Sequence, residues 1–276
     1  MNYNELYGQI RLKKSFLCVG LDTDFERLPA CIKKDILPQF TFNKSIIDAT
    51  AKSAISFKLN TAFYECRGHN GWRELEMTVE YIKQTYPEIF IIADAKRGDI
   101  GNTSTKYASA FFNQMPCDAI TVNPYMGADS VMPFLEFNDK WVIILGLTSN
   151  SGAEDFQLDT LKNNDQKLFQ QVIKRSAGWG SHERIMFVAG ATRPEMLMNI
   201  RQIIPLHFLL IPGIGAQGGD LEQVAEYGLN NYCGLLVNSS RDILFTDSSA
   251  GFADAAGQKA EIIAAQMKTL LSAKSL

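Results

Sequence analysis

The chain has 276 residues, of which 46% are hydrophobic and 21% are charged, and its formal net charge is −3. Such a chain can bury a large core without metal or disulfide staples, and a (β/α)₈ barrel typically needs about 250 residues. The weak negative charge argues against a nucleic-acid-binding surface, which usually carries a basic excess. There is no apolar run of about 18 residues and no apolar leader, so we expect neither a membrane span nor a signal peptide.

The number and spacing of cysteines and histidines argue against disulfide bonds and metal centres. The five cysteines are odd in number and none forms a CxxC pair, and the three histidines lie far apart in the sequence. We therefore expect no disulfide framework and no zinc site. This usage is typical of the reducing cytoplasm.

Short apolar runs alternate with segments of helical length along the whole chain. Alternating β and α units predict a parallel sheet with helical crossovers, and eight of them indicate a single (β/α)₈ TIM barrel domain over residues 1–276. A doubly wound open sheet is the structural alternative. The eight predicted strands are Phe16–Leu21, Ala54–Leu59, Ile89–Ala93, Ala119–Val122, Trp141–Leu147, Ile185–Ala189, Phe208–Ile211 and Gly234–Val237.

Five segments between these runs have the periodicity or composition of helices. They are Phe42–Ala54, Glu74–Tyr86, Thr103–Gln114, Leu221–Tyr227 and Ala255–Ala273. In the second, Leu75, Val79, Ile82 and Tyr86 fall on one face, and in the third, Tyr107, Ala110, Phe111 and Gln114 lie along one side. Asp220 is a plausible N-cap for the fourth. The stretch Ser149–Ser181 is long enough for a lid over an active site, and its part Asp159–Arg175 is predicted to be helical.

Charged residues gather where the second and third strands end, which is the face of a barrel that carries chemistry. Asp94 and Lys96 are two residues apart, so an extended backbone points both side chains to the same face. Asp99 follows across Gly98, where the chain can turn sharply, and Lys58 comes from the neighbouring strand. We expect an alternating Lys–Asp–Lys–Asp array whose opposite charges keep one another ionised.

Such an array suits decarboxylation at a carbon that has no adjacent electron sink. A fixed carboxylate would repel a substrate carboxylate, and that repulsion is relieved as CO₂ leaves. A lysine ammonium would stabilise the developing carbanion and then donate its proton. The alternative interpretation is a structural ion-pair network at the rim of the barrel.

A glycine-rich segment follows the seventh predicted strand, with G-x-G-x-x-G at Gly213, Gly215 and Gly218. A dinucleotide-binding interpretation is poor, because no acidic residue ends the next strand. Backbone N–H groups of this loop can cradle one phosphate at a helix N-terminus, and loops after strands seven and eight are the usual phosphate site of barrels. Arg241, after the eighth strand, is placed to clamp that phosphate. A tight turn without a ligand is the alternative.

Two polar loop residues complete the candidates. Ser149, after the fifth strand, has a hydroxyl that can donate to and accept from the edge of a planar base. Clusters of Ser, Asn and Gly are mostly ordinary loops, so this signal is weak by itself. Asn123, after the fourth strand, is a candidate neighbour of the ligand with no assigned role.

Three motifs together resemble the orotidine 5'-phosphate decarboxylase family, in its longer bacterial branch called type 2. They are Phe57–Asn60, Asp94–Thr103 and Pro212–Gly219, and the resemblance runs from Asp22 to Arg241. It implies a barrel that acts as a homodimer with active sites at the subunit interface. It also implies a cofactor-free, metal-free conversion of orotidine 5'-monophosphate to UMP and CO₂, the last step of de novo pyrimidine nucleotide synthesis.

The resemblance also implies a role for each matching residue. Lys96 would protonate C6, Asp94 would lie beside the substrate carboxylate, and Asp99 would reach into the partner's site. The remaining implied contacts are Asp22 and Lys58 with the ribose hydroxyls, Ile100 and Thr103 beside Asp99, Ser149 with the pyrimidine edge, and Gln217 and Arg241 with the 5'-phosphate, helped by the backbone from Pro212 to Gly218.

Two other functions remain open. Related Mg²⁺-dependent barrels act on keto-sugar phosphates, such as 3-keto-gulonate 6-phosphate decarboxylase or hexulose-phosphate synthase, and they share D-x-K-x-x-D. Arg97 and Ile100 within the motif favour the nucleotide enzyme. A non-catalytic barrel that senses nucleotides is the other alternative, although binding alone does not require a carboxylate placed to repel its ligand.

Overall fold

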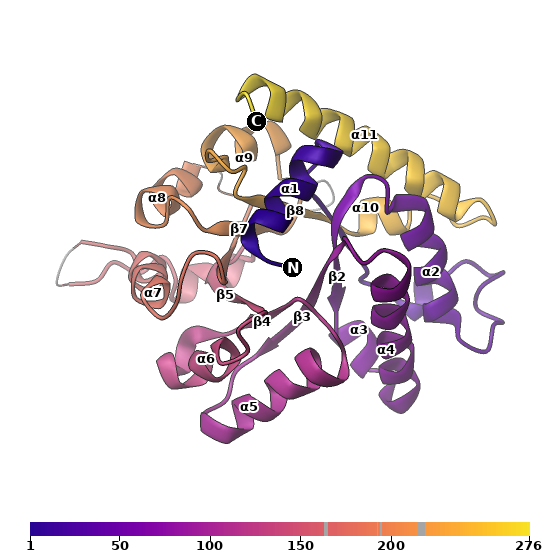
Figure 1. Cartoon of the computed structure of the whole chain (residues 1–276), viewed down its shortest axis with the longest axis horizontal. Coiled ribbons are helices and arrows are strands. Elements are labelled where there is room, and N and C mark those ends of the chain that lie inside the picture. Colours follow the sequence, from indigo (N-terminus) through magenta and orange to yellow (C-terminus); the bar gives the residue numbers. More distant parts are fainter. Residues whose placement is uncertain (163–164, 192, 194, 215–218) are drawn as a thin grey trace.

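The computed structural model describes every residue except 163–164, 192, 194 and 215–218. In the described part, eight parallel strands each pair with the next, and β8 pairs with β1, so the sheet closes into a barrel (Figure 1). This confirms the predicted barrel and excludes the open sheet. The strands are β1 (Leu17–Gly20), β2 (Ala54–Asn60), β3 (Phe90–Arg97), β4 (Ala119–Val122), β5 (Trp141–Leu147), β6 (Ile185–Ala189), β7 (Phe208–Ile211) and β8 (Leu235–Ser239).

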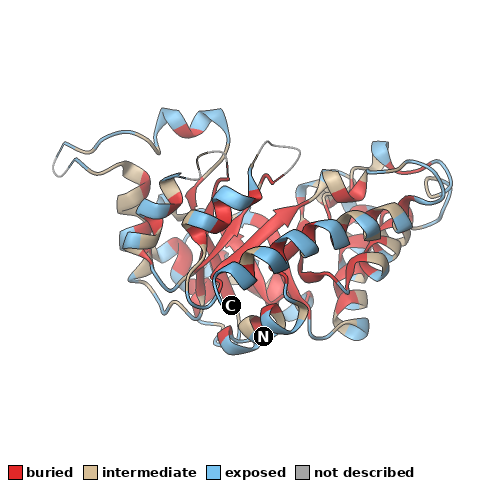
Figure 2. Cartoon of the chain, turned by 90° about the horizontal axis from the view of Figure 1, so that it is seen from above, coloured by how far each residue is buried: buried red, intermediate tan, exposed pale blue. Residues whose placement is uncertain are grey.

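Helices surround the strands, so the sheet is buried on both faces, as Figures 1 and 2 show. This explains why the strands are continuous apolar runs rather than alternating ones. None of the helices in the described ranges combines the length and apolarity that a membrane crossing needs. The helices are α1 (Tyr3–Lys13), α2 (Pro38–Thr50), α3 (Ala62–Glu65), α4 (Gly68–Thr85), α5 (Gly101–Ser109), α6 (Ala128–Leu135), α7 (Leu168–Ala177), α8 (Glu195–Ile203), α9 (Leu221–Gly228), α10 (Arg241–Leu244) and α11 (Phe252–Ala273), with short turns η1 (Phe25–Arg27), η2 (Ala110–Gln114), η3 (Pro124–Met126) and η4 (Ser151–Asp155).

Several predicted helix boundaries are wrong. Helix α2 starts at Pro38 rather than Phe42, because proline fits the first helical position, where its missing N–H is not needed. Its predicted last residue, Ala54, instead begins β2. The segment predicted to be helical from Asp159 contains an antiparallel pairing of Thr160 with Lys167, so α7 begins only afterwards.

The side of helix 103–114 that the spacing groups together is not the buried one, whereas the predicted face of α4 is buried except at Tyr86, which follows the helix and is half-buried. The last turn, η2, is a π turn, which fits one extra residue into the helix and rotates the faces. Ala108, Phe111 and Phe112 are therefore buried, while Tyr107 and Gln114 are exposed. In α4, the predicted apolar residues at 75, 79 and 82 are buried.

Helix α1 covers the end of the barrel at which the strands begin (Figure 1). The Asn2 side chain caps it by accepting from the backbone N–H of Glu5, and the Glu5 carboxylate accepts from the backbone N–H of Asn2. Tyr3 packs against Trp141 and Phe208, the first residues of β5 and β7. This end of the barrel is therefore sealed by aromatic packing, and the opposite end is left for ligands.

Candidate active site

A cavity of about 190 Å³ lies where the strands end. One wall comes from the ends of β1, β2 and β3 and carries two lysines and two aspartates. The opposite wall comes from β6, β7, β8 and the segments that follow them. The described lining residues are Asp22, Lys58, Asn60, Asp94, Lys96, Val188, Leu210, Pro212, Gly213, Ile214, Asn238, Ser240 and Arg241.

The charged wall is a continuous row of alternating signs. The Nζ of Lys58 lies 3.4 Å from Oδ1 of Asp22 and 2.8 Å from Oδ2 of Asp94. The other oxygen of Asp94, Oδ1, lies 2.6 Å from Nζ of Lys96. The structure thus brings together four predicted residues, in the order Asp22–Lys58–Asp94–Lys96.

The row keeps its inner members ionised. Burial alone would lower the pKa of Lys58, but the carboxylates of Asp22 and Asp94 outweigh it and raise that pKa above its ordinary value. Burial would likewise raise the pKa of Asp94, yet Lys58 and Lys96 together hold it well below its ordinary value. Asp94 is therefore a fixed, largely buried negative charge.

The motif of β3 does not have the simple extended geometry that we expected. Ala93 pairs with Ile120 and Arg97 pairs with Val122, so the three residues between them stand opposite one residue of β4. This bulge places the backbone of Lys96 in the left-handed region, with φ of 46°. The side chains of residues 94 and 96 do meet, but through the bulge rather than through simple alternation.

Asp99 lies outside this row within one chain. Its carboxylate accepts a hydrogen bond from the backbone N–H of Ile100 at 2.7 Å. Among the hydrogen bonds and ion pairs between described residues, none joins Asp99 to either lysine of the row. Ile100 and Thr103 are exposed at the start of α5, and they do not line the cavity in the described part of the chain.

The predicted phosphate wall is described in part. Pro212 lines the cavity, and so does Arg241, which begins α10 and is exposed. Gln217 and Gly218 lie outside the described residues. Asp220 caps α9 by accepting hydrogen bonds from the N–H groups of residues 222 and 223, which confirms the predicted cap.

Ser149 lies beside the second wall rather than on the described lining of the cavity. A Cβ on Gly190 would come within 2.9 Å of the Ser149 backbone, so the loop after β5 packs directly on the end of β6. Gln157 braces this loop, because its amide accepts from the N–H of Thr148 and donates to its hydroxyl, both at 2.8 Å. Asn123 accepts from the N–H of residue 125, which assigns it a capping role at η3.

Several residues of the site were not predicted from the sequence. Asn60, Asn238 and Ser240 line the cavity, and each is a polar residue at or just after a strand end, which is a readable signal. Val188 and Leu210 form an apolar patch of the second wall, and their sequence context does not separate them from the core.

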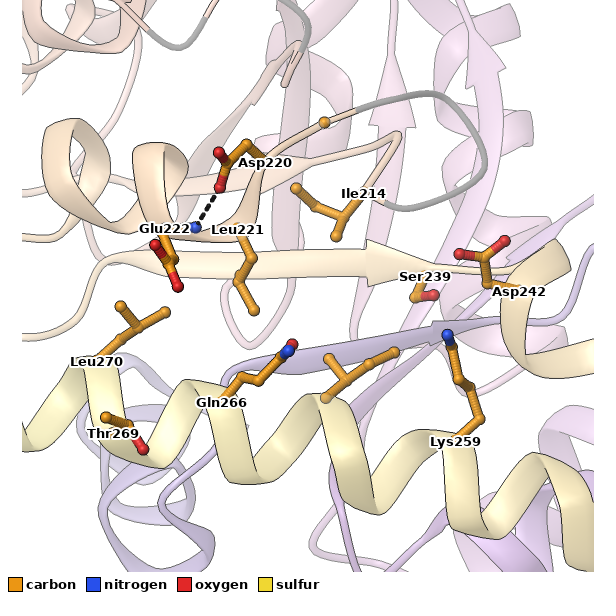
Figure 3. A pocket seen from close by; sticks show the side chains of 12 residues that line it. Ile214, Asp220, Leu221, Glu222, Ser239, Asp242, Lys259, Gln266, Thr269 and Leu270 are labelled. Carbon is orange, nitrogen blue, oxygen red and sulfur yellow. Dashed lines mark hydrogen bonds between the residues drawn. The ribbon is translucent and has the colours of Figure 1, made fainter.

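A larger hollow of about 590 Å³ lies outside the barrel, between α9 and α11 (Figure 3). Its described lining shares only Ile214 with the 190 Å³ cavity at the strand ends. It contains none of the residues of the charged row. Size alone would therefore choose the wrong cavity. Among the described residues, no group of three or more His, Cys, Asp or Glu side chains is arranged to hold a metal ion.

Comparison with known proteins gives a consistent result. Residues 15–255 match the orotidine 5'-phosphate decarboxylase / HUMPS family. The chain is 54% identical over 271 residues to the orotidine 5'-phosphate decarboxylase of Phocaeicola vulgatus, covering 98% of this chain and 99% of the relative. It is 51% identical over 277 residues to that of Porphyromonas gingivalis strain ATCC BAA-308 / W83, covering 100% of both chains.

Solved structures agree with the sequence relatives. The chain is similar to Leishmania donovani OMP decarboxylase, with a TM-score of 0.81 and 34% identity over 98% of this chain and 100% of that one. It also matches Leishmania donovani UMP synthase, with a TM-score of 0.80 and 34% identity over 96% of this chain and 57% of the larger one.

Proposed function

Because the chain belongs to the orotidine 5'-phosphate decarboxylase / HUMPS family, we propose that its barrel mouth removes the C6 carboxylate of orotidine 5'-monophosphate and releases UMP and CO₂. The observation that carries this proposal is the row Asp22–Lys58–Asp94–Lys96 at the ends of three adjacent strands. It combines a proton donor with a fixed negative charge in one cavity.

Lys96 is the proton donor. When the bond between C6 and the carboxylate breaks, CO₂ leaves and the electron pair stays on C6. The ammonium of Lys96 stabilises this pair and transfers a proton to C6, and the resulting amine regains its proton from water. The side chain of Lys96 is half exposed, so it can reach a ligand in the cavity.

Asp94 lies next to the departing carboxylate and aims the ammonium of Lys96. Its negative charge disfavours the substrate carboxylate in the ground state and loses this unfavourable partner when CO₂ leaves. Lys58 holds the other oxygen of Asp94 and is itself held by Asp22, and Lys58 and Asp22 present polar atoms to the ribose hydroxyls. These charges are in place before the substrate arrives, so little reorganisation is needed during reaction.

The opposite wall holds the 5'-phosphate. Arg241 supplies a guanidinium, Pro212 lines the wall beside it, and Gln217 and the backbone N–H groups that follow Pro212 as far as Gly218 are the further donors. Ser149 reads the pyrimidine edge. Binding energy from these contacts, which lie away from the reacting carbon, orders the site for decarboxylation.

We propose that the chain acts as a homodimer in which Asp99 completes the partner's row. Asp99 lies just before α5. Exposed apolar side chains lie at the start of α5 and on α5, η3 and α6, and α6 packs against both α5 and η3. An exposed apolar patch of this kind is typical of a protein interface. Its members are Ile100, Tyr107, Tyr125, Met126 and Met132.

We also propose that residues 1–276 form one domain in the cytoplasm, with no nucleic acid or membrane partner. The pairing of β1 with β8 joins the two ends of the barrel into one sheet. The five cysteines are free, which suits a reducing compartment.

The test is incubation of the purified protein with orotidine 5'-monophosphate in excess EDTA, followed by ultraviolet absorbance and product chromatography. We expect conversion to UMP. The named relatives favour this activity over a Mg²⁺-dependent keto-sugar phosphate reaction. A folded protein that binds UMP tightly but does not convert the substrate would support the nucleotide-sensing alternative instead.

A further inference from the structure

A buried threonine stands opposite the bulge that carries the motif. Thr121 of β4 is fully buried. It is the single residue of β4 that stands opposite residues 94–96 of β3. Its hydroxyl accepts a hydrogen bond from the backbone N–H of Lys96 at 2.9 Å and donates one to Oδ1 of Asp94 at 3.0 Å. One hydroxyl thus binds both residues of the reacting pair.

The donor and acceptor in each of these two hydrogen bonds follow from the chemistry of the partner groups. A backbone N–H can only donate, and an ionised carboxylate can only accept. The single hydroxyl proton of Thr121 must therefore point at Asp94, while an oxygen lone pair receives Lys96. Oδ1 of Asp94 then has two donors, this hydroxyl and the Nζ of Lys96, which fix the plane of the carboxylate.

The same hydroxyl supports an unfavourable backbone conformation. Lys96 has φ of 46°, which is costly for a residue with a side chain and persists only when its surroundings hold it. A bulge interrupts the ladder of backbone hydrogen bonds, and the Thr121 hydroxyl takes the N–H of Lys96 in place of a strand carbonyl. This conformation directs the lysine side chain back over Asp94, with Nζ 2.6 Å from Oδ1.

We propose that Thr121 is a positioning residue for the decarboxylation, which aims the Lys96 ammonium and the Asp94 carboxylate without touching the substrate. The inference rests on the proposed function, because it concerns the same reacting pair. It predicts that loss of the hydroxyl impairs the chemical step while leaving ribose and phosphate binding in place.

The test compares Thr121→Val, which keeps the shape but lacks the hydroxyl, with Thr121→Ser, which keeps the hydroxyl. Thr50→Val is the matched control, because Thr50 is also fully buried and its hydroxyl bonds only within α2, to the Ile46 carbonyl at 2.7 Å. We expect Thr121→Val to lower kcat by about 10- to 100-fold, the range for losing a hydrogen bond to a charged group. KM and the Kd of UMP should change by less than about threefold, and both Thr121→Ser and Thr50→Val should keep kcat within about threefold of wild type.

A second measurement needs no catalysis. Hydrogen exchange of the Lys96 amide, followed at residue resolution in the ligand-free protein, should become at least about tenfold faster in Thr121→Val and stay slow in Thr121→Ser and Thr50→Val. If Thr121→Val does not fold, Thr121→Cys, whose thiol is a weak donor and acceptor, replaces it in both measurements with the same direction expected.

Wild-type kcat or unchanged Lys96 exchange in the hydroxyl-free variant would overturn the role of Thr121. Equal impairment of Thr121→Ser would overturn it as well, because shape rather than the hydroxyl would then matter. A folded wild-type protein without decarboxylase activity would instead overturn the proposed function, and with it the catalytic meaning of this contact.

Discussion

Lys58 and Lys96 carry the same charge but differ in how far they are buried. The side chain of Lys58 is 5% exposed and is held between two carboxylates, whereas that of Lys96 is 50% exposed and is held by one. A proton donor must reach its acceptor in the ligand, so geometry selects Lys96 for proton transfer and leaves Lys58 as a fixed charge.

Replacing Lys96 by alanine should therefore remove the chemical step and spare ligand binding. We expect Lys96→Ala to lower kcat at least about 10³-fold, because it removes both the proton donor and the charge that stabilises the carbanion. The Kd of UMP should change by less than about tenfold, since the proposed phosphate contacts lie on the other wall. Steady-state kinetics and a UMP titration measure both quantities. Lys52→Ala, which alters an exposed lysine, is the control, and appreciable turnover by Lys96→Ala would refute the assigned role.

The depressed pKa of Asp94 makes stability depend on pH with a defined sign. The folded-state pKa lies below that of the unfolded chain, about 3.9 for an ordinary aspartate, so the stabilisation is complete above that value and is lost as pH falls through the folded pKa. Asp94→Asn leaves Lys58 without its nearer partner, 2.8 Å away, and should lower the free energy of unfolding by about 3 kcal/mol at pH 7.

Urea unfolding at several pH values measures this effect. The difference in free energy of unfolding between wild type and Asp94→Asn should shrink steadily below about pH 4. The exposed Asp155→Asn serves as the control and should show a small difference at every pH. If this difference in free energy stayed constant down to pH 2.5, Asp94 would not stabilise the fold through its charge.

At the scale of single elements, strands were easier to predict than helices. Each strand is fully covered, so it leaves an apolar run that is bounded by polar residues, and all eight were found. The bulge in β3 and the π turn after α5 each insert residues without changing composition, so neither leaves a periodic signal. Helix α1 was missed although Asn2 and Glu5 form a readable capping box.

The candidate site was predictable for the same reason as the strands. The ends of parallel strands meet at one face, so Lys58, Asp94 and Lys96 could be placed together from sequence order, whereas Asp22 was added through the family resemblance and Asp99, also predicted for the array, lies outside the row in one chain. Contacts that depend on exact register could not be predicted. Thr121 is an ordinary strand residue until the bulge sets it against Asp94.

The N-terminus of α9 provides a test at this scale. Asp220→Ala removes a side chain that accepts from two N–H groups and should lower the free energy of unfolding by about 1 kcal/mol. Asp254→Ala is the matched control, because Asp254 lies in the first turn of α11 without being its cap residue. Thermal and urea unfolding measure both. An equal loss from the two substitutions would assign the effect to charge near a helix end rather than to capping.

For the whole molecule, the shared-site proposal can be tested by mixing two inactive proteins. Lys96→Ala keeps its own Asp99, and Asp99→Ala keeps its own Lys96. A mixed dimer then contains one site with both residues intact, so equal mixing with free exchange should restore about a quarter of wild-type activity. No recovery after demonstrated subunit exchange would place Asp99 outside the partner's site.

The apolar patch beside Asp99 predicts the dimer interface. Tyr125 is 91% exposed in the single chain, and Tyr125→Glu would bury a charge in the interface, which should shift the protein to monomers and lower its activity by at least about tenfold. Ile36→Glu changes an isoleucine that is 96% exposed but lies outside the patch. Sedimentation velocity should find this control dimeric, and a dimeric, active Tyr125→Glu would move the interface elsewhere.

The two walls of the cavity come from different halves of the chain. Asp22, Lys58, Asp94 and Lys96 all precede α6, whereas Pro212 and Arg241 follow it. A gene recombined in the segment between α6 and β5 would therefore inherit the charged row from one parent and the proposed phosphate-binding wall from the other. Such recombination during evolution could change which phosphorylated molecule is bound while leaving the charged row unchanged. Laboratory chimeras joined at residues 136–140 would reproduce this exchange.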